Sequence, residues 1–445
     1  MTSAHALEVI DALGGFARLV KRSPTLDGAV PLRVAQACVP LLEGNAFGFQ
    51  IELAHAIVVR RRLGRTAVEI DVAHRDAITR ARRAAVPRLA AERLLVPDGP
   101  WHRALAEHVV WFERPHVRVW TGLLVRAPRG VWLRVSNTAN RRNRLLDVRE
   151  THIDDDGRWV PLVVDMVVHG DGEVKLQGEI ACIAPLAPGS RITCVDLADA
   201  PALGRAHAAF YDEAYFATKK AEPTRKYRRL VAREGASNED ADAPVATIAR
   251  VGPSRYDVTR ASGFLHADAT KPRAASRDSR TIEHVIYEND IAFTVRFDGH
   301  TLAIDHDARA LASAARDVER RWAAVYGAGS IERDRRALWY LTKYFTPHPP
   351  GDPHFFVKPW TFTKTVPGWS CLVDGVQRDE YDVMRGVVST DSFHATPAVF
   401  WMHRIGERVR VPAGAPLLRV VPVPRWLVRA KVREMPWTID WSASS

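Results

Sequence analysis

The stretch PRGVWLRV at residues 128–135 decides the fold, because a related stretch, PGWSCLV, stands at residues 367–373. Each begins with Pro and Gly, which favour a turn, and continues with aromatic and β-branched residues, which favour a strand. A turn and strand that recur far apart in one chain are typical of an internally repeated fold.

The segments that follow these two stretches are also alike, IACIAP at 180–185 and LRVVP at 418–422. From Gly130 to Pro185 is 55 positions, and from Gly368 to Pro422 is 54. A third pair precedes them, NAFGFQI from Asn45 and NDIAFTV from Asn289, whose distances to the two glycines are 85 and 79 positions. Three motifs in one order with similar spacings predict an internal duplication.

Each predicted copy is rich in β-forming residues and carries one helical insertion. The sequence predicts a mainly β protein with helical insertions, of the α+β class, built as a pair of β-sandwich or open-barrel domains. The expected strand regions are 117–135, 160–168, 355–372 and 399–423. The expected helical insertions span 72–95 and 307–345, and Asp307 is placed to cap the second.

The expected boundaries follow from these patterns. Leu7, Ile10, Leu13 and Phe16 recur at helical spacing, and the segment ASNEDADAP at 236–244 has no large apolar residue to anchor it. The predicted organisation is an amphipathic helix at 1–29, copy one at 30–200, a helical and mobile linker at 201–274, copy two at 275–430 and a tail at 431–445.

Composition narrows the class of protein. The net charge is +11, but the 63 Lys and Arg residues are scattered in short runs, so nucleic acid is an unlikely partner. Four cysteines without a C-x-x-C motif favour unpaired thiols.

The sequence shows neither a signal peptide nor an apolar stretch long enough for a membrane, which predicts a cytoplasmic protein. A monomer and a homo- or hetero-oligomer are both compatible with these features.

The second copy resembles a known bacterial family. The segments that carry the likeness are Trp360 to Trp369, GVVSTD at 386–391, and VPAGAP at 411–416 leading to Pro422. Over roughly residues 285–425 this pattern is similar to a family known only as domain of unknown function 6065. The resemblance implies a bacterial origin and supports the boundaries of the second copy, but it brings no activity with it.

A cupin-like feature is also present. The segment GERVRVPAG at 406–414 has the spacing of the second cupin motif, in which a His ligand follows the last Gly by three positions. That position is Leu417 here, so the resemblance transfers no metal ligand.

Several His and Asp residues of copy two are candidate metal ligands. Two imidazoles and one carboxylate form the ligand set of non-haem Fe(II) enzymes. The candidates for Fe(II) or another divalent metal are His348, His354, Asp391, His394 and His403. A structural role for the same residues, such as His packing on aromatic rings, is the competing interpretation.

Aromatic residues around these candidates could line a pocket. They are Trp339, Tyr344, Trp360, Trp369 and Trp401. The sequence therefore leads to two functional hypotheses. The first is a metal-dependent oxygenase or related tailoring enzyme acting on a small or peptide-like substrate. The alternative is a non-catalytic peptide- or partner-binding protein built from paired β-domains.

Overall fold

A computed structural model of the chain describes most of its 445 residues. The described residues are 6–20, 48–63, 65–113, 115–137, 146–187, 189–210, 244–254, 256–261, 282–347, 351, 353–375, 381–383, 386–391, 394–402, 404–428 and 431–437.

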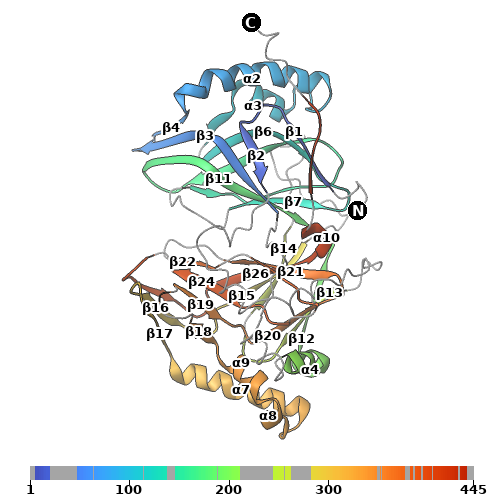
Figure 1. Ribbon diagram of the computed structural model, residues 1–445, viewed down its shortest axis with the longest axis vertical. Coiled ribbons are helices and arrows are strands. Elements are labelled where there is room, and N and C mark those ends of the chain that lie inside the picture. The colour runs from blue at the N-terminus through green and yellow to red at the C-terminus, as the bar shows by residue number, and fades with distance from the viewer. Residues whose placement is uncertain are drawn as a thin grey trace.

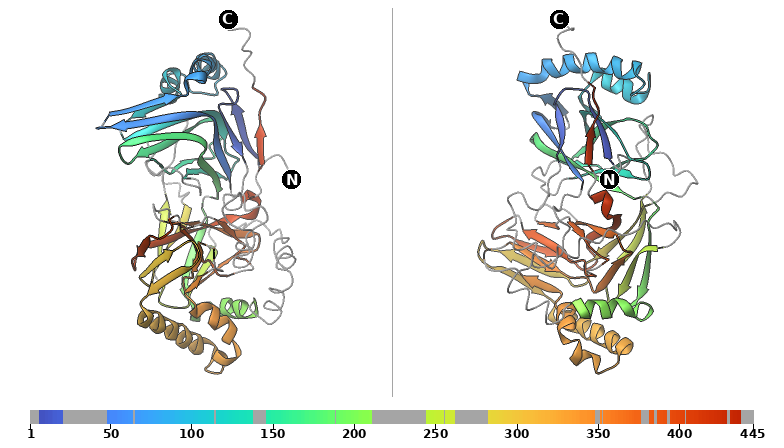
Figure 2. Two further views of the ribbon diagram at one scale, coloured as in Figure 1. Left: turned by 60° about the vertical axis from the view of Figure 1, so that its left-hand side comes forward. Right: turned by 45° about the vertical axis from the view of Figure 1, so that its right-hand side comes forward.

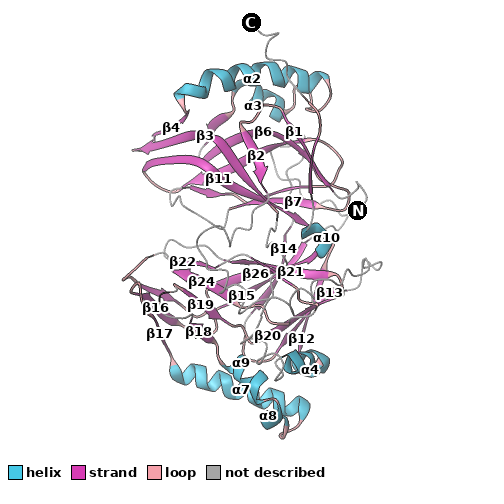
Figure 3. Ribbon diagram, in the orientation of Figure 1, coloured by secondary structure: helices cyan, strands magenta, loops and turns pink. Residues whose placement is uncertain are grey.

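The protein is mainly β, as the sequence predicts: of the described residues, 50% lie in strands and 23% in helices. Two β-rich lobes lie end to end along the long axis, and helices cover the two far ends (Figures 1 and 3). The strands that the structure describes form several separate sheets, and none of these sheets closes into a barrel. We call residues 6–210 the N-terminal half and residues 244–437 the C-terminal half.

Each half contains an antiparallel sheet in which five strands have the same order, and we call these five strands the five-stranded sheet of that half. In the N-terminal half the order is β2 (Ala17–Val20), β3 (Phe49–Arg62), β11 (Gly172–Leu186), β7 (Trp132–Ser136) and β9 (Thr151–Ile153). In this half a sixth strand, β4 (Arg65–Ile70), also pairs with β3. In the C-terminal half it is β14 (Tyr256–Ala261), β15 (Ile282–Glu288), β26 (Pro416–Pro424), β21 (Trp369–Gly375) and β23 (Gly386–Val388). In both, the last strand of the five along the chain lies in the middle of the sheet.

The pairing register agrees with two of the three sequence motifs. Leu133 pairs with Pro185 in the first sheet, and Cys371 pairs with Pro422 in the second. These are the residues that the Gly130 and Gly368 motifs align with one another. Both glycines have positive φ, 77° and 83°, a conformation that glycine adopts without strain.

The third motif pair is out of register. The alignment of Asn45 with Asn289 would place Phe49 opposite Phe293. Instead, Phe49 on β3 pairs with the central strand β11, as Val285 on β15 pairs with the central strand β26. Phe293 lies on β16 (Phe293–Phe297), which belongs to a separate sheet with β17 (Leu302–His306) and β25 (Arg408–Val411). The structural counterpart of Phe49 is therefore Val285, eight residues before the Phe293 that the sequence alignment gives. Asn45 itself lies outside the described residues.

The helical insertions directly follow a hairpin in both halves, β3–β4 in the N-terminal half and β16–β17 in the C-terminal half. In the N-terminal half β4 (Arg65–Ile70) is followed by α2 (Val72–Ala91) and α3 (Pro100–Glu107). In the C-terminal half β17 is followed by α7 (Ala308–Tyr326), α8 (Ser330–Arg333) and α9 (Arg335–Thr342). Asp307 accepts the N–H groups of Arg309 and Ala310, which confirms the expected cap. No helix within the described ranges has the length and hydropathy of a membrane span.

A second sheet packs behind each five-stranded one. In the N-terminal half it contains β1 (Ala6–Asp11), β5 (Val110–Glu113), β6 (His116–Arg126), β8 (Leu146–Val148) and β10 (Val160–Val168). In the C-terminal half the corresponding layer is split. One part joins β13 (Pro244–Arg250) to β20 (Thr361–Thr365), and the other joins β18 (Phe345–Pro347), β19 (His354–Val357), β24 (Ala398–Met402) and β22 (Tyr381–Val383).

The two halves exchange their final strands. β12 (Arg191–Asp196) lies near the end of the N-terminal half in the chain, but it pairs in parallel with β13 of the other half. β27 (Lys431–Glu434) lies at the end of the C-terminal half, after α10 (Arg425–Val428), but it pairs in parallel with β1 (Figure 2). Trp437 consequently lies in the core of the N-terminal half, and Leu197 lies in the core of the C-terminal half.

The five-stranded sheets face one another. Alternate residues of β7 point to opposite sides, so Leu133 enters its own core while Trp132 joins a small cluster between the halves. Buried Arg134 forms an ion pair with Asp374 across this interface, with Nη2 and Oδ2 2.8 Å apart. In the reverse sense, Arg419 of the C-terminal half donates a hydrogen bond to Glu150 of the N-terminal half. Burial alone would raise the pKa of Glu150, but Arg134 and Arg419 lower it to about 2.

Three of the predicted boundaries are wrong. Residues 6–11 form strand β1 rather than part of a helix, and Leu7 and Val9 are buried at alternate positions of this strand. Gly14 and Gly15, both at positive φ, interrupt any helical continuation. Within the expected helical and mobile linker at 201–274, residues 244–250 form β13 and residues 256–261 form β14. The expected tail at 431–445 begins with β27, which is held by β1. These strands are recruited by distant partners, which local sequence patterns do not reveal.

Candidate functional site

The five metal candidates do not form a ligand cluster in the part of the chain that is described. His348 and His403 lie outside the described residues. Among the residues that the structure places, no three His, Cys, Asp or Glu side chains form a group able to hold a metal ion. The remaining three candidates, His354, Asp391 and His394, each have a structural environment of their own.

Asp391 stabilises a turn and a buried cation. Its Oδ2 accepts the N–H of Gly368 at 3.3 Å, and its Oδ1 forms an ion pair with the buried guanidinium of Arg425. In the N-terminal half, Asp155 accepts the N–H of Gly130 at 2.6 Å. The aspartate therefore follows the glycine turn in both halves, which gives it a structural task without any metal.

His394 and His354 are buried between packed elements. The Nδ1 atom of His394 lies 3.0 Å from the carbonyl oxygen of Thr390. His354 on β19 stacks with Trp401 on β24, with ring centroids 6.0 Å apart. The competing interpretation, in which His rings pack on aromatics, describes His354 well.

A second buried imidazole lies near His394. His207 is on α4 (Pro201–Phe210), which follows the short helix η2 (Leu197–Asp199), and its ring is 4.5 Å from that of Phe362. Burial lowers the pKa of His207 well below 6.5, and the nearby charges of His394 and Lys358 lower it further. Burial also lowers the pKa of His394. Both rings are therefore stabilised in the neutral form.

Acidification should loosen the attachment of α4. Because the pKa of His207 is lower in the folded than in the unfolded protein, its contribution to stability is complete above about pH 6.5 and is lost as the pH falls toward the folded pKa. Denaturant unfolding at pH 5 and pH 7.5 measures this loss. His207→Phe should reduce the difference between the two pH values, whereas His300→Phe, at an exposed histidine, should not. An unchanged difference in His207→Phe would contradict the assignment.

Two of the five candidate pocket aromatics are core residues, and the other three are partly or half exposed. Trp360 is fully buried, and its indole N–H donates to the carbonyl oxygen of Leu341. Tyr344 is also buried and donates its hydroxyl to Asn289. Trp339 is half exposed on α9, with Lys343 over its ring, and Trp369 and Trp401 are partly buried on different strands. None of the five lines the pocket described next.

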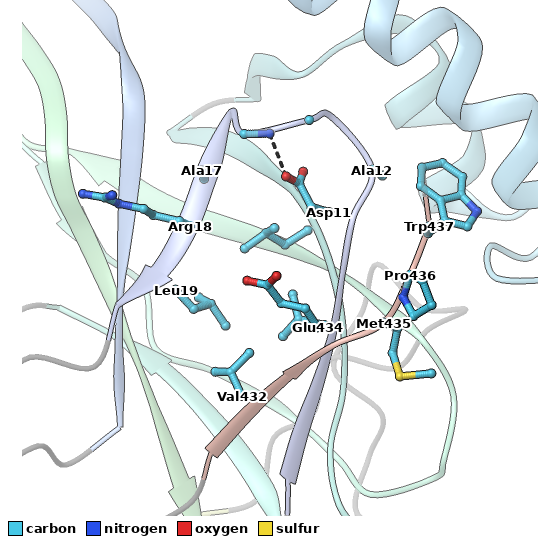
Figure 4. A pocket seen from close by; sticks show the side chains of 14 residues that line it. Asp11, Ala12, Ala17, Arg18, Leu19, Val432, Glu434, Met435, Pro436 and Trp437 are labelled. Carbon is cyan, nitrogen blue, oxygen red and sulfur yellow. Dashed lines mark hydrogen bonds between the residues drawn. The ribbon is translucent and has the colours of Figure 1, made fainter. Parts of the chain in front are cut away.

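The structure instead contains a pocket that sequence reasoning missed, in the N-terminal half beside the exchanged strand (Figure 4). It has a volume of about 550 Å³ and lies between β1, the turn that leads to β2, and β27. Its lining residues are Val9, Asp11, Ala12, Gly14, Gly15, Ala17, Arg18, Leu19, Leu123, Val432, Glu434, Met435, Pro436 and Trp437.

The turn between β1 and β2 shapes the pocket. Asp11 accepts the N–H groups of Leu13 and Gly15, at 3.2 and 2.6 Å, which fixes its carboxylate beside the cavity. Gly14 and Gly15 have φ of 62° and 94°, and a Cβ at Gly15 would meet only open space. The double glycine was the available sequence signal, since it marks a turn where the helical pattern predicted none.

The polar groups of the pocket are mostly acidic. Asp11 and Glu434 both present carboxylates to the cavity, whereas the guanidinium of Arg18 points away toward Glu52, which it bonds at 2.9 and 3.0 Å (Figure 4). Partial burial raises the pKa of Asp11, and the charge of Glu434 raises it further, although hydrogen bonds from the turn oppose this. The charged form of Asp11 is thus disfavoured.

The far wall of the pocket is anchored to α2. The indole N–H of Trp437 donates to Glu92 at 2.7 Å, and Arg88 lies over the Trp437 ring at 4.7 Å. The N–H of Met435 donates to Val9, which continues the β27 pairing. The segment 431–437 is therefore held along its length and can serve as a stable wall.

No family model matches the sequence, and no curated protein matches it.

Proposed function

We propose that this chain is a ligand-binding protein whose site is the pocket between the β1–β2 turn and β27. The observation that carries the proposal is a cavity of about 550 Å³ that places two carboxylates, Asp11 and Glu434, beside apolar side chains. Ligand pockets commonly measure roughly 300–1,000 Å³ and combine an apolar lining with a few polar groups that orient the ligand. The binding hypothesis therefore takes precedence over the metal-dependent enzyme.

Small residues provide the room. Ala12, Gly14, Gly15 and Ala17 line one side, where longer side chains would occupy the cavity. Leu19, Leu123 and Val432 supply an apolar surface, and they come from three different strands. Because Val432 and Glu434 of β27 line the pocket, the site depends on the exchanged strand.

We further infer that the two halves are copies of one duplicated unit, each a β-sandwich that donates its last strand to the other. This inference is supported by the common order of the five-stranded sheets, the common register at Pro185 and Pro422, and the reciprocal parallel strands β12 and β27. The likeness of the second copy to domain of unknown function 6065 is kept as a proposal about that copy alone.

Blocking the pocket should abolish ligand binding. A thermal-shift screen of small molecules on the full chain should yield ligands that raise Tm by a few degrees at saturating concentration, because binding to the folded state alone stabilises it. Leu19→Trp should weaken those ligands at least tenfold, since the indole would occupy the cavity. Ile405→Trp, at an exposed position outside the pocket, is the matched control.

Two results would count against the proposal. One is a screen without any ligand. The other is a ligand whose affinity is the same in Leu19→Trp and in the native chain, because such a ligand binds elsewhere.

A further inference from the structure

The C-terminal half contains a counterpart of the pocket region. There β13 pairs in parallel with the exchanged strand β12, as β1 does with β27. Arg250 is the last residue of β13, as Asp11 is the last residue of β1. Tyr256 begins β14, as Ala17 begins β2. The two places in the fold match, but their side chains differ in charge and size.

In the C-terminal half the corresponding position contains a cationic side chain of the protein, Arg250. The guanidinium of Arg250 bonds the carboxylate of Asp196 on β12 through two contacts, Nε to Oδ1 at 2.9 Å and Nη2 to Oδ2 at 3.2 Å. Tyr256 adds a large ring nearby, and its hydroxyl forms a hydrogen bond with the thiol of Cys194. The exchanged strand thus meets a guanidinium and an aromatic side chain that belong to the half itself.

In the N-terminal half the carboxylates are present and the cation is not. Asp11 stands where the other half has Arg250, and the exchanged strand supplies a second carboxylate, Glu434, which lies opposite Val9, whereas Asp196 lies opposite Arg250 itself. Within the described residues neither Asp11 nor Glu434 is paired with a Lys or Arg side chain. Arg18, which also lines the pocket, is committed to Glu52. Ala17 in place of Tyr256 leaves the space open.

We infer that the pocket binds a guanidinium group carried on a short aliphatic chain, which would give Asp11 and Glu434 the kind of cationic partner that Arg250 gives Asp196 in the C-terminal half. This inference rests on the proposed ligand-binding function and names the class of its ligand. A planar guanidinium presents several N–H donors at once, so it can bond two carboxylates, while Leu19 and Val432 contact the aliphatic part. The raised pKa of Asp11 is consistent with this occupant, because a cation would restore its charged form.

Calorimetry on the full chain with n-butylguanidinium as the probe tests the inference. The expected result is saturable binding in low salt that n-butylurea, the neutral analogue of similar shape, does not show. Glu434→Gln removes one charge at an exposed residue and should weaken binding by roughly ten- to a hundredfold. Asp11→Asn should do the same, and Asp98→Asn, an exposed carboxylate outside the pocket, should leave binding unchanged.

A second arm identifies the source of the guanidinium. A blocked tripeptide with a central arginine offers the same group on a peptide, so its affinity relative to n-butylguanidinium distinguishes a peptide side chain from a free small molecule.

The outcomes separate this inference from the proposed function. Equal binding of n-butylurea and n-butylguanidinium, or binding insensitive to Glu434→Gln and Asp11→Asn, would overturn the guanidinium assignment. If ligands sensitive to Leu19→Trp were still found, the pocket would keep its function with a neutral or anionic ligand. If no such ligand were found either, both proposals would fall.

Discussion

Separate expression of the two halves, divided within residues 211–243, should give two polypeptides that do not fold alone but associate when produced together. Each half would lack a strand that the other carries, since β27 completes the sheet of β1 and β12 completes the sheet of β13. Without β27 the N-terminal half would also lose Trp437 from its core, and without β12 and η2 the C-terminal half would lose Leu197. A missing strand leaves unpaired backbone groups and exposed apolar surface, both of which are costly.

Circular dichroism and size-exclusion chromatography of each half alone and of the coexpressed pair would measure this. The control is a full chain with a protease site placed within 211–243, cut after folding, whose fragments should elute as one particle. A half that is folded and monomeric by itself would contradict the interdependence, and with it the inference that the exchanged strands hold the copies together.

The sequence predicted the fold class well where local patterns coincide with long-range pairing. The expected strand at 160–168 has the bounds of β10, and Asp307 begins α7 as its residue type predicts. The aligned turns at Gly130 and Gly368 lie at matching places because both need a residue with positive φ beside a central strand.

Other features depended on distant partners and could not be predicted. Leu7, Ile10 and Leu13 have helical spacing, but pairing of residues 6–11 with β6 and β27 on either side outweighs local preference. The slip of the Phe49 motif has a related cause, because alternating apolar residues fit several registers and only the partner strand selects one.

The candidate site was predicted less well than the fold. His and aromatic residues are conspicuous in the sequence, but Trp360 and Tyr344 fill the core and His354 packs on Trp401. The pocket is formed by residues from the two ends of the chain, Asp11 and Glu434 among them. Nothing in the sequence brings these ends together, because β27 lies at the end of one half and pairs with the other.

Asp391→Asn should be strongly destabilising, whereas Asp155→Asn should have a small effect. Both aspartates accept the N–H of a turn glycine, but only Asp391 is also an ion-pair partner of the buried Arg425. Removing one member of a buried ion pair typically costs about 3–5 kcal/mol, because the other charge stays buried without its counterion. Weakening a single hydrogen bond at an exposed turn costs about 0.5–1.5 kcal/mol.

Urea unfolding of the native chain and the two variants at pH 7 provides the measurement, and Asp155→Asn serves as the matched control for the turn contribution. The comparison also tests the metal hypothesis at its central carboxylate. If Asp391 acted as a metal ligand and not as a partner of Arg425, chelator treatment of the native chain would reproduce the loss of stability. The structural assignment instead expects no effect of chelator and a much larger loss in Asp391→Asn than in Asp155→Asn. Equal, small losses in the two variants would show that Arg425 does not depend on Asp391.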